Sequence, residues 1–355
     1  MTHHRFKEPR FLAWMPLIVI ALLILLWQST PNLPVQNDRF MAFGTMVDVS
    51  IIGVSRELSE QAVERLEDDF EKMHQMWHAW DPGPLERVNE MIAEGKTFSA
   101  PTSVLPLIKI GQQLAEQSDN LFNPAIGQLI DAWGFHETPE GERKPPEEED
   151  IKALLEKNPL MSDISIDGFH LSSSNPAVKL DFGAFGKGYG IDMAINTLKE
   201  MGIDNAIVNA GGDLRAMGSR DGKPWRIAVR SPDSSDVLGV IKSSTDESVF
   251  TSGDYERNFD YKGKRYHHII DPRTGYPTTE VSSVTVIHSD ATTADAAATA
   301  LFVAGPELWH KIAKQMGIKY VLMIDKQGTL HMNPAMQKRL ELLASNHPVK
   351  ISDPL

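Results

Sequence analysis

The sequence predicts an α+β fold with mixed β-sheets and helices packed on them, preceded by one N-terminal transmembrane helix. Met46–Ile52 alternates apolar and polar residues as a half-buried strand does, and Leu58–Met76 carries apolar residues at helical spacing. Short strand patterns recur along the rest of the chain. Ahead of the first strand, Phe11–Trp27 is a run of 17 residues without a charge.

Length and composition limit the classes of protein that fit. The 355 residues suffice for two domains, or for one large domain with an anchor. The net charge is −13 and no basic cluster stands out, so nucleic acid is not expected as a partner. The chain has no cysteine, which excludes disulfides, zinc–thiolate sites and a lipid-bearing N-terminal cysteine and suits an oxidising compartment.

The uncharged run Phe11–Trp27 reads as a membrane segment, because about 17–25 apolar residues span a bilayer. Three basic residues precede it, which places the tail 1–10 in the cytoplasm by the positive-inside rule. No small-x-small cleavage site follows, so an uncleaved anchor is favoured over a removed signal peptide. Residues 28–38, with two prolines, suit a linker, and the globular domain is expected at 39–345, with a C-terminal tail at 346–355.

The remaining elements follow from periodicity and turn residues. Glu137–Asp150 is polar and contains three prolines, which indicates a surface excursion. Lys262-Gly263 marks the turn of a hairpin formed by 255–261 and 264–268. Further helices are predicted at 103–117, 126–133, 191–201, 293–302, 306–316 and 336–343, and further strands at 164–166, 169–172, 178–182, 205–209, 214–217, 225–229, 237–242, 248–254, 284–288 and 320–324.

Two features of the first helix have competing interpretations. His74 and His78 are four residues apart on one face, a spacing that can bind a metal, but a solvated or packed helix face is favoured. Trp77 and Trp80 lie beside a proline-rich turn, where aromatic rings can stack on a flat ligand. The alternative is a tryptophan pair that seals the edge of the core.

The segment Gly183–Gly190 reads Gly-Ala-Phe-Gly-Lys-Gly-Tyr-Gly and is predicted to be a turn that enters a helix. It resembles a phosphate cradle, because glycines let main-chain amides approach oxygens closely. Its spacing matches neither a Walker loop nor a dinucleotide-binding fingerprint. Tight packing between a strand and a helix is the alternative.

The stretch Tyr266–Pro277 holds two histidines, a carboxylate and a guanidinium on a predicted tight loop. Such groups bind anions or move protons, which makes His268 a candidate site residue. The alternative is that Asp271 caps the turn and Arg273 pairs with it. Farther along, Asp295 and Thr299 lie one turn apart on a predicted alanine-rich helix and could form a sparse, hard-oxygen site for magnesium.

Five stretches together resemble the FAD:protein FMN transferase family, often called ApbE-like, and in order and spacing they cover about residues 40–345. They are Phe43–Thr45, Leu180–Tyr189, Asn209–Asp213, Thr251–Asp254 with His268–Gly275, and Ala294–Ala300. The resemblance implies an enzyme that cleaves FAD between its two phosphates. It attaches FMN through a phosphoester to a Ser or Thr hydroxyl of a partner protein, releases AMP and uses Mg²⁺.

The resemblance also implies roles for individual residues. His268 matches the proposed catalytic base, and Mg²⁺ is expected on the carbonyl of Ala184 and the side chains of Asp295 and Thr299. Flavin nucleotide contacts are expected at Phe43, Trp80, Leu121, Phe122, Asn123, Asp181, Lys187 and Ile270. Many relatives carry Met in place of Phe43, and the aromatic residue matched to Trp80 is commonly Tyr.

The uncharged run, its basic flank and the family resemblance together predict a single-pass protein of the inner membrane with its catalytic domain in the periplasm. Many relatives are lipoproteins, whereas this chain would use Phe11–Trp27 as its anchor. The expected acceptor is a membrane redox subunit. Two other functions remain open: an Mg²⁺-dependent FAD pyrophosphatase that gives FMN and AMP, and a non-catalytic periplasmic flavin carrier or adaptor.

Overall fold

The computed structural model describes residues 34–136, 143–234, 236–343 and 347–355, and its compact unit is Val35–Leu355. The predicted membrane segment Phe11–Trp27 and the tail before it lie outside the described residues. Among the helices that are described, none is long and apolar enough to cross a membrane.

The centre of the fold is a nine-stranded sheet in the order β1-β2-β6-β7-β10-β13-β14-β15-β17. Neighbouring strands are antiparallel except β15 and β17, which are parallel, so the sheet is mixed as predicted. The strands are β1 Gln36–Ala42, β2 Thr45–Ile52, β6 Asn205–Ala210, β7 Asp213–Met217, β10 Asp246–Gly253, β13 Val281–His288, β14 Tyr320–Asp325, β15 Leu330–Met332 and β17 Val349–Ile351. Thus part of the predicted linker and part of the predicted tail are strands of this sheet.

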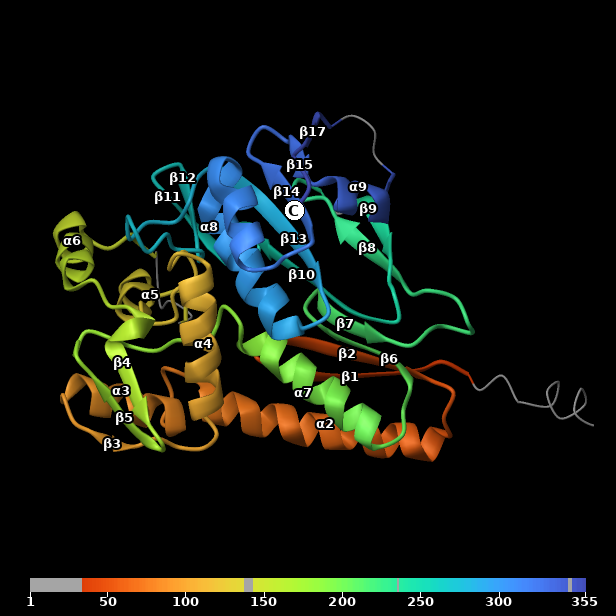
Figure 1. The fold of residues 1–355 in the computed structure, drawn as a ribbon, viewed down its shortest axis with the longest axis horizontal. Helices are drawn as coiled ribbons and strands as arrows, with labels where there is room; N and C mark the ends of the chain where they lie inside the picture. Colours follow the sequence, from red (N-terminus) through yellow and green to blue (C-terminus); the bar gives the residue numbers. More distant parts are fainter. Residues whose placement is uncertain (1–33, 137–142, 235, 344–346) are drawn as a thin grey trace, which may run out of the picture. The chain divides into compact units, whose positions relative to one another are not determined.

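Three long helices, α2 Arg56–Trp77, α7 Gly186–Glu200 and α8 Ala291–Gln315, pack beside one another on one face of the sheet (Figure 1). Helix α2 buries Leu66, Phe70 and Met73 at helical spacing, as its sequence predicts. Helix α8 joins two predicted helices, and its backbone leaves helical geometry at Gly305, which has φ 68°.

The opposite face of the sheet is covered by a small three-stranded sheet of β16 Leu340–Leu342, β9 Val237–Lys242 and β8 Arg226–Arg230. Side chains alternate between the two faces, so Phe250 joins the core with the helices while its neighbour Val249 joins the core with β8 and β9. The predicted α+β fold with a mixed sheet and packed helices is therefore confirmed for the described residues, whereas the predicted N-terminal transmembrane helix lies outside them.

The other elements surround one end of the scaffold. The helices are α3 Pro84–Ala93, α4 Leu105–Gln117, α5 Gly127–Trp133, α6 Glu148–Lys157, a short 3₁₀ turn at Met161–Asp163, and α9 Pro334–Arg339. Two further small sheets are β3 Phe98–Ser99 with β5 His170–Ser173 and β4 Ile164–Asp167, and the hairpin of β11 Asn258–Tyr261 and β12 Lys264–His267.

Four element predictions need correction. Residues 178–182 do not form a strand, because the Asn89 side chain bonds both the N–H and the C=O of Leu180, at 2.7 and 2.9 Å. The polar excursion ends earlier than predicted, since α6 begins at Glu148. The predicted C-terminal helix stops at Arg339, where the chain turns into β16 to pair with β9. The helix that follows the glycine-rich segment begins at Gly186, earlier than the predicted start at Ile191.

Candidate active site

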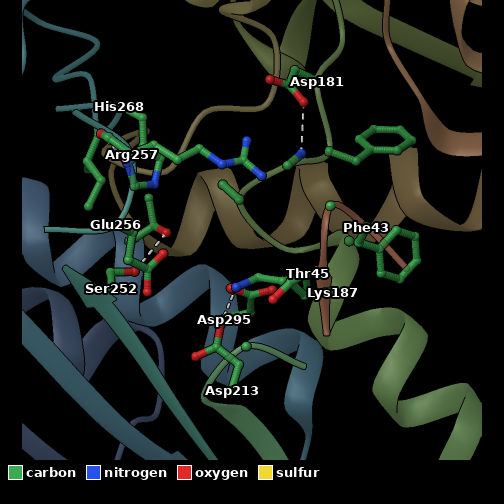
Figure 2. Close-up of a pocket in the computed structure, with 18 of the residues that line it drawn as sticks. Phe43, Thr45, Asp181, Lys187, Asp213, Ser252, Glu256, Arg257, His268 and Asp295 are labelled. Carbon is green, nitrogen blue, oxygen red and sulfur yellow. Dashed lines mark hydrogen bonds and ion pairs between the residues drawn. The ribbon is translucent and has the colours of Figure 1, made fainter. Parts of the chain in front are cut away.

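One cavity of about 960 Å³ brings together all the residues that the family resemblance implies for the site, although they come from separate stretches of the chain. Figure 2 labels five of them: Phe43, Asp181, Lys187, His268 and Asp295. It lies between the β1–β2 turn, the N-terminal end of α7, α8, strand β8 and the loops on either side of the β11–β12 hairpin. The residues are Phe43, Trp80, Leu121, Phe122, Asn123, Asp181, Ala184, Lys187, His268, Ile270, Asp295 and Thr299.

Gly183–Phe185 form a turn ahead of the helix as predicted, but α7 begins at Gly186, so the rest of the glycine-rich segment belongs to the helix. A side chain at Gly188 would place its Cβ 2.4 Å from the Ala291 carbonyl oxygen, and one at Gly190 would lie 2.9 Å from the Phe43 ring. Tight packing of α7 against α8 and the β1–β2 turn therefore explains these two glycines. The phosphate-cradle interpretation stays a prediction for Gly183 and Gly186, which line the cavity.

This close packing places Asp295 of α8 against the start of α7. The Oδ2 atom of Asp295 accepts the Gly188 N–H at 2.9 Å, and the carboxyl is buried. Burial raises the pKa of Asp295 to about 8, Lys187 opposes the rise and Asp213 adds to it. Burial thus disfavours the charged form of Asp295 more than Lys187 stabilises it.

Lys187 is held in its charged form by an ion pair with Asp213. Burial alone would lower the pKa of Lys187, but the carboxylates of Asp213 and Asp295 outweigh it and raise the pKa. The other carboxylate oxygen of Asp213, a residue of β7, accepts the N–H of Thr251 on β10 at 2.8 Å, which fixes the orientation of the carboxylate. Lys187 therefore presents a fixed positive charge to the cavity.

The oxygen groups around Asp295 fit a hard divalent cation. Thr299 lies one helical turn from Asp295, and its Oγ1 is 3.3 Å from the Ser252 hydroxyl, while Ala184 lines the same cavity. Within the described ranges no group of three or more His, Cys, Asp or Glu side chains could hold a metal ion. A cation here would have few protein ligands, as Mg²⁺ does when it keeps waters and phosphate oxygens.

His268 is held by the main chain of Arg257. The Arg257 carbonyl accepts the His268 N–H at 3.0 Å and lies 3.3 Å from the ring Nδ1. A carbonyl can only accept, so Nδ1 carries the proton and Nε2 keeps its lone pair. Burial lowers the pKa of His268 to about 3, helped by the positive charge of Arg257 and by His267.

The other charged residues of the Tyr266–Pro277 stretch build the loop itself. Arg273 pairs with Asp271 at 2.7 Å, and the Asp271 main chain closes the turn by accepting the Gly275 N–H at 2.8 Å. His267 accepts the Ile269 N–H at Nδ1, and its Nε2 lies 2.7 Å from the Thr278 carbonyl. Only His268 of this group lines the cavity.

Aromatic rings line the end of the cavity where flavin contacts are predicted. Phe43 has φ 50° in the tight β1–β2 turn, and its ring stacks on Trp77 with 6.1 Å between centroids. The Trp80 ring stacks on His136 at 4.0 Å, and the Lys179 Nζ lies 3.9 Å from its centroid. Trp77 also donates its indole N–H to the Ser103 carbonyl at 3.0 Å, so it packs in the core and also lines the cavity.

Three further residues that the sequence analysis named, His74, His78 and Asn123, line the same region. The His78 Nδ1 accepts the Asp81 N–H at 3.0 Å and so closes the end of α2. His74 packs near the Phe43 ring, which favours the packed-face interpretation of the histidine pair. The Asn123 side chain bonds the Ala125 N–H and the Pro159 carbonyl, both at 3.0 Å, and orders its own loop.

The sequence analysis missed Arg230, Tyr255, Glu256 and Arg257, all of which line the cavity. Within the described part of the chain, no carboxylate lies within ion-pair distance of the Arg257 guanidinium. Figure 2 shows the Arg257 side chain pointing into the cavity, and its terminal nitrogen lies 3.8 Å from where a Cβ on Gly44 would be. The position of Arg257 shortly after the Thr251–Asp254 motif was the signal that could have identified it.

Comparison with known proteins places this site in a family. The sequence model of the ApbE family matches residues 43–322. A Rhodobacter capsulatus protein named FAD:protein FMN transferase is 41% identical over 91% of this chain, and the chain spans only 62% of that relative's length. A Vibrio cholerae protein of the same name is 35% identical over 68% of this chain and 72% of its own length.

A solved structure has the same fold. The crystal structure of an ApbE protein from Thermotoga maritima superimposes with a TM-score of 0.79 at 32% identity, over 86% of this chain and 99% of that one. The family match covers every cavity residue described above. The chain therefore belongs to the ApbE family.

Proposed function

We propose that this chain is an FAD:protein FMN transferase. The acceptor's Ser or Thr oxygen attacks the phosphorus on the FMN side of FAD, the bond to AMP breaks, and FMN becomes attached through a phosphoester. The observation that carries the proposal is that His268, with a free Nε2 lone pair, shares one cavity with the desolvated carboxyl of Asp295 and the cation of Lys187.

The charges in the cavity suit the two phosphates of FAD. Lys187 presents a fixed cation, and the Arg257 guanidinium has five N–H donors that no described carboxylate engages. Charge-assisted hydrogen bonds from such a group to phosphate oxygens are stronger than neutral ones. Arg257 and Lys187 would therefore hold the diphosphate.

Mg²⁺ would be held by the Asp295 carboxylate, the Thr299 hydroxyl and the Ala184 carbonyl. When bound, it would neutralise charge on the phosphate oxygens and so ease cleavage of the phosphoanhydride. The raised pKa of Asp295 supports this assignment, because a nearby cation would stabilise the carboxylate that burial disfavours.

His268 would take the proton of the acceptor hydroxyl. Its Nδ1 is committed to the Arg257 carbonyl, which leaves Nε2 to accept the proton as the oxygen attacks. The low pKa of His268 arises partly from the Arg257 charge. Phosphates bound to Arg257 would offset that charge and raise the basicity of His268 toward the working pH.

The location and the acceptor belong to the same proposal. The uncharged run Phe11–Trp27 behind three basic residues supports a single-pass inner-membrane protein with its cavity in the periplasm. The acceptor would be a membrane redox subunit that exposes a Ser or Thr there. Both assignments rest on the sequence and on the resemblance to the family.

The test uses the detergent-solubilised full chain, FAD and Mg²⁺, with membranes from a strain of the source organism that lacks this gene. We expect flavin fluorescence that stays on a protein band through a denaturing gel, together with release of AMP. AMP release without a fluorescent band would indicate a FAD pyrophosphatase. FAD binding with neither product would indicate a carrier.

A further inference from the structure

Strand β8 forms a wall of the cavity that none of the predicted flavin or metal contacts uses. Four consecutive residues, Ile227–Arg230, line the cavity. Side chains alternate along a strand, and here Ile227 and Val229 are buried in the core while Ala228 and Arg230 are exposed. Four consecutive residues can line one cavity only if the strand turns its backbone edge toward it.

Strand β8 is the edge of its sheet, which has the order β16-β9-β8. Beyond one end of the strand pair, the Ser243 N–H donates to the Trp225 carbonyl at 2.9 Å, so residues 225 and 243 form a hydrogen-bonded pair. Such pairs alternate in an antiparallel ladder, and Ala228 opposite Val240 is therefore a non-hydrogen-bonded pair. The N–H and C=O of Ala228 point away from β9, toward the open edge.

The pairing on the far side of β9 agrees with this assignment. The Leu343 N–H donates to the Leu238 carbonyl at 2.9 Å. Val240 lies two residues after Leu238, so its main-chain N–H and C=O point toward β16 and not toward β8. Outside the β8–β9 ladder, no main-chain hydrogen bond engages Ala228 among the described residues. An unpaired donor and acceptor thus lie together at the cavity wall.

The end of β8 lies beside the segment that holds the candidate base. The Arg230 guanidinium lies 5.5 Å from the centroid of the Tyr255 ring. Two residues after Tyr255, the Arg257 carbonyl holds both the main chain and the ring of His268. A polypeptide segment that lies along the edge of β8 would therefore extend toward His268.

The chemistry of transfer requires a polypeptide at this place. A Ser or Thr hydroxyl is only two bonds from the Cα atom, so the acceptor main chain must itself approach the cavity. Main-chain N–H and C=O groups that leave water need partners. A free strand edge supplies such partners without demanding a particular sequence, as in β-strand addition to a sheet edge.

We propose that the free edge of β8 binds an extended segment of the acceptor protein as an added strand. Ala228 supplies the central pair of main-chain hydrogen bonds, and the acceptor hydroxyl enters the cavity toward His268. This inference rests on the proposed transferase function. It names a site for the protein substrate that is distinct from the predicted contacts to FAD.

The test is Ala228→Pro in the full chain, because proline deletes the free N–H at an edge while leaving the β9 side of the ladder intact. With membranes of the deletion strain as the acceptor source, we expect roughly tenfold or greater loss of covalent flavin labelling. FAD affinity, measured by flavin fluorescence, should match that of the unsubstituted chain. Wild-type labelling by Ala228→Pro would overturn the proposal, and so would a parallel loss of FAD affinity.

A matched control is Ile351→Pro on β17. The Ser352 N–H donates to the Met332 carbonyl on β15, so the N–H of Ile351 points to the opposite, free edge, and Ile351 does not line the cavity. This variant should label acceptors at the normal rate, and equal losses in both proline variants would contradict a specific site at β8. If the unsubstituted chain itself labels nothing, the proposed function fails, which is a different result.

A second pair of variants guards against misfolding of Ala228→Pro. The chain has no cysteine, so Ala228→Cys and Ile351→Cys each offer one thiol to a bulky maleimide. Modification at position 228 should block labelling of acceptors and leave FAD binding unchanged, whereas modification at 351 should block neither. Unimpaired labelling after modification at 228 would overturn the proposal.

Discussion

The ring Nδ1 of His268 lies 3.3 Å from the main-chain carbonyl of Arg257, and the side chain of that same arginine points into the cavity beside the ring. One residue thus fixes the tautomer of the candidate base through its backbone and lowers the basicity of that base through its charge. In the proposed function the guanidinium would also face the phosphates of FAD, so binding of FAD would change the basicity of His268.

Replacing His268 with Gln should slow transfer by about 10²–10⁴-fold and leave FAD affinity nearly unchanged, because a base acts on the acceptor hydroxyl and not on FAD. Labelling rates and flavin fluorescence titrations measure the two quantities separately. An equal loss of rate and of FAD affinity would make His268 a structural contact.

Replacing Arg257 with Gln should weaken binding of FAD and AMP by roughly 10- to 100-fold, since hydrogen bonds to charged groups contribute about 1.5–3 kcal/mol. Riboflavin has no phosphate, so its affinity should not change. Arg265→Gln, which removes an exposed pair with Asp260 outside the cavity, is the control. Equal effects on riboflavin and AMP would show that Arg257 acts by shaping the cavity.

In the absence of FAD, His268 should lower the stability of the fold in mild acid. The ordinary pKa of histidine is 6.5 and the pKa of His268 in the folded chain is about 3, so the unfolded chain binds a proton below pH 6.5 that the folded chain does not. Stability is therefore unaffected above pH 6.5 and falls as the pH drops from 6.5 toward 3. In urea unfolding at pH 7.5 and 5.5, His268→Gln should lose about 1 kcal/mol less than the unsubstituted chain. An identical pH dependence would contradict the shift.

Replacing Asp295 with Asn should abolish most Mg²⁺-dependent transfer, because Asp295 is the one carboxylate in the proposed ligand set. Thr299→Ala should be milder, since a water can replace a neutral hydroxyl in an octahedral shell. The labelling rate of each variant is measured as a function of Mg²⁺ concentration, and the melting temperature checks that each variant folds. Asp295→Asn should show the larger loss of rate. A wild-type rate for Asp295→Asn at equal Mg²⁺ would place the ion elsewhere.

The mature protein should retain Phe11–Trp27, because the run lacks a following cleavage site. Intact mass or N-terminal sequencing of the protein from isolated membranes checks this. A sequence that starts near residue 30 would show that the segment is a signal peptide.

The sequence alone identified twelve of the residues that line the cavity, but it missed Arg257. Periodicity located α2, most strands and the hairpin, because these depend on local patterns of apolar residues and on turn residues such as Lys262-Gly263. The ordered motifs pointed to the candidate residues, and all of them line one cavity. Their individual roles remain predictions.

Tertiary structure decided what each group can do. The sequence around Gly188 is compatible with a phosphate cradle or with tight packing, and the 2.4 Å approach to Ala291, a residue far along the chain, selects packing. The tautomer of His268 depends on a carbonyl across the hairpin, and the open edge of β8 depends on which strands pair with β9. These contacts join residues distant in sequence, so local propensity carries no information about them, and only the folded main chain sets their hydrogen-bond partners.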